Sequence, residues 1–585
     1  MLSSPHPTGV NMLLFSVSWT ADGGPGALGY GGSVGAAGDV NGDGYADVIV
    51  GASGFADTQS AEGAVFVYLG ASTGLYGTDP AWTADSDQEF AALGTSVAGL
   101  GDVNGDGYAD AGAGAPGMDR AFAWHGGPYG LDVTAAWAGR SDELGARYGA
   151  AMAGAGDVNG DGYGDIAVGA SADEGRAFLY LGAATGLADD PIWTADGNEV
   201  QTNLGASLAS AGDVDADGYD DVVVGAAARA DLYMGSAGGL EPAAAWTATE
   251  GTDDAGFGRS VSGAGDVDGD GYADVVAGAL LFDDAFGDDG AAFAYAGSSN
   301  GPSADPEWSV TGHQAGAHLG ASVAGAGDVN ADGYDDVAVG APAYDAAFVD
   351  NGRVTVYLGA ATGISTRSIW TGDGPPVAGA AFGTAVATAG DVDADGFADL
   401  IVGAPLTGDG GRVYVFYGGF GNDADGDGVF DTIDECLGDD ASGDADRDDV
   451  CALAVDGAVQ DCDDTNDTVY PGAPELCDGL DTSCTGILPA NESDADGDLG
   501  FPCGGDCDDS DPAAGPNHAE TCGDLIDNDC DGELDESCGP GEAAVTEPDA
   551  TGCGCASTGA AGTSAALSLA ALAWVRRARR TLPAI

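Results

Sequence analysis

The sequence predicts an all-β fold, a seven-bladed β-propeller, followed by a small, disulfide-rich, irregular region and a short C-terminal apolar helix. Three observations lead to this expectation. A nine-residue acidic pattern recurs seven times at intervals of 53 to 63 residues, each copy lies in a unit of about four short strands, and all 12 cysteines follow the last copy. Four-stranded units repeated four to eight times are typical of propellers.

The strands of each unit follow the same order. An aromatic residue or Leu followed by Gly precedes the acidic pattern, as at Phe257, and a β-branched run ending in Gly-Ala comes after it, as at Val48. An alternating segment such as GRVTVYLG, from Gly352, leads to a final strand that contains Trp. Alternating or β-branched runs between Gly-rich turns are typical of strands, so each unit supplies about four.

The phase of the repeat predicts how the ring closes. Trp19 precedes the acidic pattern at Asp39 by the same 20 residues that separate Trp82 from Asp102, whereas the seventh unit ends near residue 419 without a Trp strand. We therefore expect Phe15–Trp19 to pair into the last blade as its outer strand, which would cover edges left open otherwise. The alternative is an open solenoid, which more often has atypical repeats at both ends.

The charge of the chain narrows the possible partners. It has 97 acidic residues against 14 basic ones, every basic residue is Arg, and the net charge is −83. Such a balance argues against nucleic acid and anionic lipid as partners, because both need a basic surface. Since 44% of the residues are hydrophobic, the acids must lie beside a real core, and bound cations are the obvious means of offsetting their repulsion.

The acidic pattern, D-x-[DN]-x-D-G-x-x-D, has the spacing of a calcium loop. Calcium takes six to eight oxygen ligands, and side chains at positions 1, 3 and 5 converge when Gly at position 6 allows a tight turn. Position 7 can add its backbone carbonyl, and Asp at position 9 closes the shell. The predicted ligands are Asp39, Asn41, Asp43, Tyr45 and Asp47; Asp102, Asn104, Asp106, Tyr108 and Asp110; Asp157, Asn159, Asp161, Tyr163 and Asp165; Asp213, Asp215, Asp217, Tyr219 and Asp221; Asp266, Asp268, Asp270, Tyr272 and Asp274; Asp328, Asn330, Asp332, Tyr334 and Asp336; and Asp391, Asp393, Asp395, Phe397 and Asp399.

A simpler interpretation is available for one copy alone, because an Asp-Gly pair can form an ordinary β-turn. Four oxygen-bearing side chains in fixed register, seven times over, favour metal binding instead. We favour a structural role for the calcium over a regulatory one and expect a chelator to lower the melting temperature.

The units resemble FG-GAP repeats, the blades of the integrin α-subunit propeller. The motif is seen at Phe382-Gly383 and at Gly403-Ala404-Pro405, and the resemblance covers residues 14–419. Other copies have Leu-Gly or Tyr-Gly in the first position and Ala-Ser in the second. The resemblance implies a calcium-stabilised propeller of about seven ions that serves adhesion or ligand recognition, although integrin propellers carry such loops in only some blades.

The region 420–538 is expected to be an acidic, Cys-rich, calcium-binding domain. Its first segment resembles a thrombospondin type 3 calcium repeat, with Asp423, Asp425, Asp427 and Asp431 as candidate ligands. Two later blocks, Asp461–Cys484 and Asp506–Cys538, resemble metal-binding repeats of bacterial surface proteins. With few apolar residues, disulfides and ions must hold this region together, which indicates an oxidising compartment. Zinc thiolate sites are the alternative, but the carboxylates favour calcium with disulfides.

The two ends of the chain bear on export. After a linker, 539–551, the segment 552–585 combines Cys553, Cys555, an apolar stretch and an Arg cluster, and resembles the C-terminal sorting tail of myxobacterial surface proteins. The resemblance implies removal of the tail and attachment through one of these cysteines. Met1–Val10 show no signal peptide, so either the start differs or export follows another route. We expect a secreted protein or one at the bacterial cell surface or outer membrane.

No catalytic motif emerges from the sequence, and we expect the protein not to be an enzyme. The five histidines are scattered, and the G-x-S-x-G match around Ser33 falls where the other repeats also have Ser or Ala. One hypothesis is a recognition protein with an unknown protein or glycan ligand at the cell surface. The second is a structural or calcium-storing envelope component, and an enzyme with a site in the propeller channel is the remaining alternative.

Overall fold

The computed structural model describes residues 17–24, 26–197, 202–251, 255–284, 286–419, 507, 508 and 530. The chain divides into two compact units, Met1–Gly443 and Asp444–Ile585. In the second unit, a disulfide joins Cys507 to Cys530, which confirms disulfide bonding in the Cys-rich region. The candidate ligands Asp423, Asp425, Asp427 and Asp431, the linker, the sorting tail and the expected C-terminal helix lie outside the described residues.

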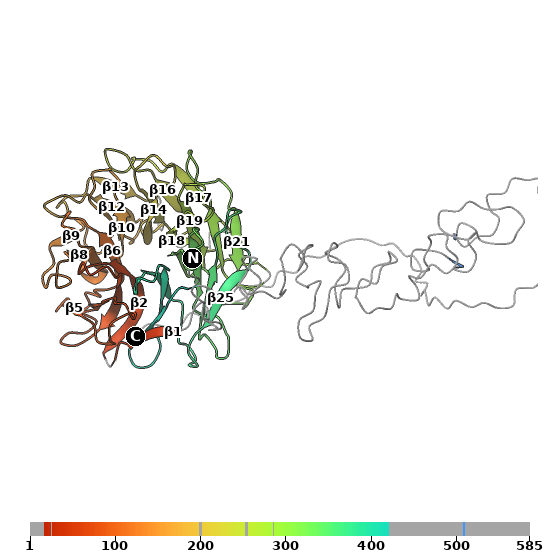
Figure 1. Ribbon diagram of the computed structural model, residues 1–585, viewed down its shortest axis with the longest axis horizontal. Coiled ribbons are helices and arrows are strands. Elements are labelled where there is room, and N and C mark those ends of the chain that lie inside the picture. The colour runs from red at the N-terminus through yellow and green to blue at the C-terminus, as the bar shows by residue number, and fades with distance from the viewer. Residues whose placement is uncertain are drawn as a thin grey trace, which may run out of the picture. The chain divides into compact units, whose positions relative to one another are not determined.

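The described part of the first unit is a seven-bladed propeller, as predicted, in which seven four-stranded antiparallel sheets surround a central axis (Figure 1). Blades 1 to 6 each consist of four consecutive strands, whereas blade 7 combines the last three strands of the propeller with its first strand. The strands are β2 Ala27–Gly38, β3 Asp47–Phe55, β4 Ala64–Tyr68 and β5 Trp82–Asp85 in blade 1; β6 Ser96–Gly101, β7 Asp110–Ala115, β8 Arg120–Trp124 and β9 Trp137–Arg140 in blade 2; β10 Tyr148–Gly156, β11 Asp165–Ala170, β12 Arg176–Tyr180 and β13 Trp193–Asp196 in blade 3; β14 Ser207–Gly212, β15 Asp221–Gly225, β16 Ala230–Tyr233 and β17 Trp246–Ala248 in blade 4; β18 Phe257–Gly265, β19 Asp274–Ala279, β20 Ala291–Tyr295 and β21 Trp308–Thr311 in blade 5; β22 Ser322–Gly327, β23 Asp336–Ala341, β24 Arg353–Tyr357 and β25 Ser368–Asp373 in blade 6; and β26 Ala385–Gly390, β27 Asp399–Ala404, β28 Arg412–Phe416 and β1 Val17–Asp22 in blade 7.

The ring closes through β1, Val17–Asp22, as the phase of the repeat predicted, while residues 15 and 16 of the expected strand lie outside the described residues. Strand β1 pairs antiparallel with β28, so Trp19 lies opposite Val415. Arg412 adds two hydrogen bonds to the carboxylate of Asp22, at 2.6 and 2.9 Å. The innermost strands of blades 1 and 7, β2 and β26, also contact each other. Segments from both ends of the propeller therefore complete one sheet.

The Gly residues of the two short motifs meet where neighbouring blades pack. A Cβ built on Gly51, in the Gly-Ala segment of blade 1, would overlap the carbonyl of Gly94 in blade 2, and Gly403 of blade 7 stands in the same relation to Gly31 of blade 1. Gly94 itself has φ of +80°, where a side chain is strained. The motifs therefore mark a place where the backbones of neighbouring blades approach closely.

Trp residues of the outer strands form hydrogen bonds to the neighbouring blade at six of the seven contacts between blades. The indole Nε1 of Trp137 donates to the carbonyl of Ala188, at 2.9 Å, and Trp193 donates to the carbonyl of Glu241, at 3.0 Å. The same bond to the loop between the third and fourth strands of the following blade is made by Trp19, Trp82, Trp137, Trp193, Trp246 and Trp308. These six Trp residues thus each contribute a contact between blades as well as part of a strand.

Candidate metal centres

The acidic loops join the first strand to the second in each of the seven blades and so lie on one face of the propeller, here called the loop face. Their backbone explains the residues at two positions. Position 4 has φ in or near the left-handed helical region, +75° at Gly42 and +56° at Ala216, which favours the Gly of four loops and strains the Ala of the other three. Position 6 has φ between +90° and +96° in all seven loops, from Gly162 to Gly396, and only Gly is found there.

The backbone of each loop curves around the carboxylate at position 1 and donates hydrogen bonds to it. In blade 1, Oδ1 of Asp39 accepts the N–H of Asp43 at 3.0 Å, and Oδ2 accepts the N–H of Gly44 at 2.8 Å. Both bonds recur in every one of the seven loops. The carboxylate at position 5 accepts the N–H of position 7, as Asp43 does from Tyr45 at 3.2 Å. These bonds turn oxygen atoms toward the inside of the loop.

The carboxylate at position 9 is buried and joins the loop to the sheet. Asp47 is fully buried, and its two oxygens accept the N–H groups of Val40, at 2.9 Å, and of Gly70, at 2.8 Å. Gly70 lies in the loop between the third and fourth strands of the same blade. Equivalent pairs of bonds are made by Asp110, Asp165, Asp221, Asp274, Asp336 and Asp399.

Burial makes a bare negative charge unfavourable at position 9. It raises the pKa of Asp47 from 3.8 to about 7, while the hydrogen bonds from Gly70 and Val40 act in the opposite direction. The pKa is raised to about 6 for Asp110 and to about 8 for Asp336, again chiefly by burial. A bound cation would supply the missing positive charge, which fits a buried ligand of this kind.

Three loops bring carboxylates together most closely. Oxygens from positions 1, 3 and 9 lie within 4.8 Å of one another in the sets Asp213, Asp215 and Asp221; Asp266, Asp268 and Asp274; and Asp391, Asp393 and Asp399. The other four loops have Asn at position 3, where the amide of Asn41 donates to Asp43 at 2.9 Å. Hard oxygen donors from carboxylates, amides and main chain suit Ca²⁺ or Mg²⁺ better than Zn²⁺ or Cu²⁺, so the residues present fit a hard divalent cation.

The ligand roles at all five positions remain predictions. The position 5 carboxylates, such as Asp217, are not members of the three close sets. At position 7, the side chain has a clear packing role: a Cβ on Gly42 would come within 2.6 Å of the ring of Tyr108 in the next blade. Loops on neighbouring blades are thus in direct contact.

Sequence reasoning missed two acidic residues at position 8, Asp220 and Asp335, each of which accepts a backbone N–H from the loop of the preceding blade. The signal was present as DGYDD where other loops have DGYAD, DGYGD or DGFAD.

Ser33, the residue of the G-x-S-x-G match, accepts the N–H of Val97 in the next blade at 3.0 Å. It therefore has a structural contact of its own between blades.

A further acidic cluster, Glu62, Asp85 and Asp87, lies away from the loops. Glu62 is 1% exposed and already accepts the N–H groups of Asp57, at 2.6 Å, and Thr58, at 3.0 Å. Its charge is stabilised by the protein, and we assign the cluster no function.

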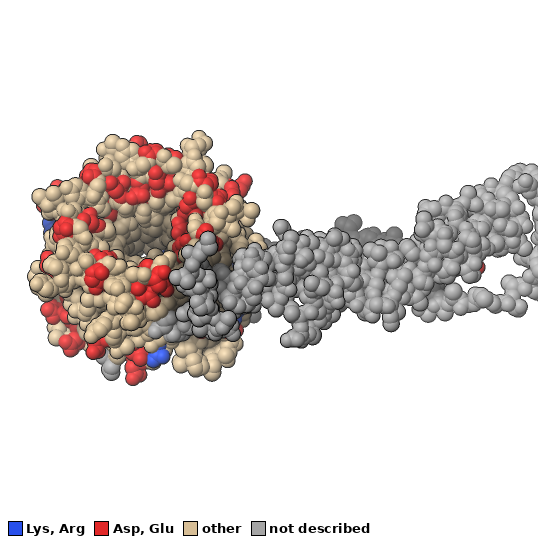
Figure 2. Space-filling model, in the orientation of Figure 1, with Lys and Arg blue, Asp and Glu red and all other residues tan. Residues whose placement is uncertain are grey.

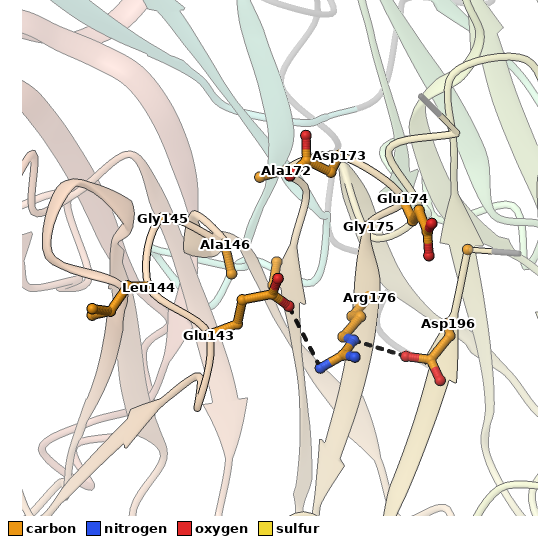
Figure 3. A pocket seen from close by; sticks show the side chains of 12 residues that line it. Glu143, Leu144, Gly145, Ala146, Ala172, Asp173, Glu174, Gly175, Arg176 and Asp196 are labelled. Carbon is orange, nitrogen blue, oxygen red and sulfur yellow. Dashed lines mark ion pairs between the residues drawn. The ribbon is translucent and has the colours of Figure 1, made fainter. Parts of the chain in front are cut away.

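The face opposite the loop face carries a polar pocket in blade 3, with a volume of about 640 Å³. Arg176 lies across it, 2.8 Å from Asp196 and 3.9 Å from Glu143, and Leu144 stands at its edge with 96% of its surface exposed (Figure 3).

The molecule is otherwise strongly acidic: in the view of Figure 2, acidic side chains gather around a central hollow and basic ones are few.

These features define a β-propeller with an acidic loop of oxygen donors in every blade. The FG-GAP repeat family matches residues 30–68, 148–180, 319–357 and 382–416, which fall in blades 1, 3, 6 and 7. A second family, described as "Putative metal-binding motif", matches residues 461–488 and 506–536. The chain therefore carries FG-GAP repeats followed by two copies of a metal-binding motif.

Curated relatives support the same assignment. Mouse integrin alpha-IIb is 37% identical over 155 residues, which are 25% of this chain and 15% of that protein. Drosophila melanogaster integrin alpha-PS2 is 40% identical over 122 residues, 19% of this chain and 8% of that protein. The chain thus spans only a small part of these relatives, at most 15% of their length.

Among solved structures, the chain is similar to the crystal structure of BBS1N in complex with ARL6DN, soaked with mercury. The match covers 69% of this chain and 97% of that chain, with 12% identity and a TM-score of 0.43. Within the described ranges, no helix has the length and apolar character needed to cross a membrane. The FG-GAP repeats, the matches to the "Putative metal-binding motif" family and the aspartate sets indicate a protein that binds divalent cations.

Proposed function

We propose that this chain is a calcium-binding protein, secreted or held at the cell surface, whose propeller recognises a protein or glycan ligand. The observation that carries the proposal is the repeated site: in seven of seven blades, a buried carboxylate at position 9 closes a loop of oxygen donors. About seven Ca²⁺ ions would occupy the propeller, with further ions in the C-terminal region. The chain would act by binding, without catalysis.

Calcium would stabilise the propeller at each loop. The chain's own residues already hold the donors in place, since positions 1 and 9 are fixed by backbone N–H groups. Without a cation, three carboxylates in one loop repel each other and position 9 is buried without a counter-charge. When bound, the ion supplies that charge, so ion binding and folding are linked.

The face opposite the loops is where we place ligand recognition. Connections at that face carry several exposed apolar side chains, including Phe90 at 62%, Leu144 at 96% and Leu406 at 65%. The pocket around Arg176 lies on the same face and offers both a guanidinium group and carboxylates. Exposed apolar groups beside such polar groups are typical of recognition surfaces.

Binding of the purified full chain to arrays of glycans and of extracellular proteins, in calcium and in EGTA, tests the proposal. We expect saturable binding to a defined member in calcium only, and weaker binding by Arg176→Ala. The matched control is Arg353→Ala, because Arg353 has the corresponding place in blade 6 and a similar bond of 2.7 Å to Asp373. Calcium-dependent stability with no ligand on either array would favour the structural or calcium-storing alternative and contradict recognition.

A further inference from the structure

The loops of the seven blades form a continuous hydrogen-bonded ring. At the boundary between each pair of neighbouring blades, here called a seam, the N–H of position 8 donates to the carbonyl of position 1 in the preceding loop, at 2.9 to 3.2 Å. The bond from Ala46 to Asp391 joins blade 1 to blade 7 and completes the ring. A second bond runs from the loop after the third strand to the position 2 carbonyl of the preceding blade, as from Ala71 to Val392 at 3.0 Å. Position 1 therefore belongs both to a cation site and to a seam.

Two seams carry an additional bond. Oδ2 of Asp220, in blade 4, accepts the N–H of Asp157 at 2.7 Å, while the N–H of Asp220 donates to the carbonyl of Asp157 at 3.2 Å. Asp335 and Asp266 repeat this reciprocal pair between blades 6 and 5, at 3.0 and 3.2 Å. The other seams have Ala or Gly at position 8 and lack the side-chain bond.

The glycine before position 1 makes room for these carboxylates. A Cβ on Gly156 or Gly265 would overlap Oδ2 of Asp220 or Asp335, respectively. At the corresponding place in blade 1, a Cβ on Gly38 would meet only the methyl group of Ala109, at 2.6 Å. The backbone therefore admits either residue at position 8, and Ala is compatible with the fold.

We propose that Asp220 and Asp335 are positioning residues that couple the cation sites of blades 3 and 4, and of blades 5 and 6, as pairs. This inference rests on the proposed calcium binding. Asp220 is adjacent in sequence to Asp221, the position 9 ligand of its own site, and it forms hydrogen bonds with both backbone groups of Asp157, the position 1 ligand of the preceding site. Ordering of one loop therefore pre-organises the other, and the coupling must be reciprocal.

Hydrogen–deuterium exchange of the full chain, titrated with calcium and followed loop by loop by mass spectrometry, tests this coupling. In Asp220→Ala, the calcium concentration that gives half protection of the blade 3 loop, 157–165, should rise about fivefold or more. The blade 1 loop, which has Ala on both of its seams, should not change. Asp220→Asn retains an oxygen acceptor, so it should restore most of the wild-type midpoint and separate positioning from charge.

A second arm tests reciprocity with a ligand variant. Asp161→Ala, in the blade 3 loop, should raise the midpoint of the blade 4 loop in the wild-type background and leave it unchanged when Asp220 is Ala. Equal midpoints for 157–165 in the wild type and in Asp220→Ala would overturn the coupling and leave calcium binding intact. Absence of calcium-dependent protection in every propeller loop would instead overturn the proposed function itself.

Discussion

Replacement of Asp336 by alanine removes a carboxylate with two separable roles. It is fully buried and accepts the N–H groups of Val329, at 2.8 Å, and Gly359, at 2.9 Å. Leaving a buried donor without a partner costs about 1–3 kcal/mol, so two of them should lower the free energy of unfolding by about 2–6 kcal/mol with or without calcium. Loss of the site should remove a further contribution in calcium, about 2.7 kcal/mol when free calcium is 100 times Kd.

Urea denaturation of the full chain, in calcium and in EGTA, measures the two contributions. The control is Asp332→Ala, which removes the exposed position 5 carboxylate of the same loop, a predicted ligand that accepts the N–H of Tyr334 and one N–H of the Asn330 side chain. In EGTA this control should lose less than about 1 kcal/mol, because the freed N–H reaches water. In calcium both variants should lose the stabilisation of one site.

The result that would refute this reasoning is equal stability of the two variants in EGTA. It would mean that the buried carboxylate does not hold the loop to the sheet. Calcium that stabilises Asp336→Ala as much as the wild type would show that position 9 is not a ligand.

Three further predictions address other parts of the propeller. Asp289→Asn should raise the free energy of unfolding by about 1 kcal/mol, because Oδ2 of the fully buried Asp289 has no hydrogen-bond partner in the described structure. Its counterpart in blade 6, Asn351, donates to the carbonyl of Gly374 at 3.0 Å. Asn351→Asp should therefore lower the free energy of unfolding in the same urea assay. Trp193→Phe should cost about 1 kcal/mol, measured in the same way, because it removes the 3.0 Å bond to Glu241 between blades 3 and 4, and a loss indistinguishable from zero would contradict that role. In EGTA, the melting temperature should fall as pH rises, because the position 9 carboxylates have pKa values of about 6 to 8 in the folded protein, above the ordinary 3.8. Their contribution to stability is fully present below about pH 4 and is lost as pH rises through 6 to 8. Saturating calcium should abolish this decline.

Periodic features were predictable from the sequence because each depends on local pattern. The number of blades, the four strands in each and the Trp strand follow from repeated residues at fixed spacing. Closure of the ring through Trp19 followed from phase alone. The positions of the acidic residues within each loop were also predictable, since Gly at position 6 and Asp at positions 1 and 9 fit a single kind of backbone turn.

Features that depend on contact between connections far apart in sequence, within a blade or between blades, could not be derived from the repeat alone. The burial of Asp47 and its bond to Gly70 join residues 23 positions apart in sequence, on different connections. The roles of Asp220 and Asp335 emerge only when loops of neighbouring blades are seen side by side. The pocket around Arg176 likewise depends on how separate connections pack, which no local pattern encodes.

A crystal structure of the protein grown in calcium, with anomalous difference density, tests the central claim most directly. The account predicts one peak in each of the seven loops, at 2.3–2.6 Å from carboxylate oxygens of positions 1 and 9. Loops without peaks in saturating calcium, or peaks that lie away from the position 9 carboxylates, would contradict it.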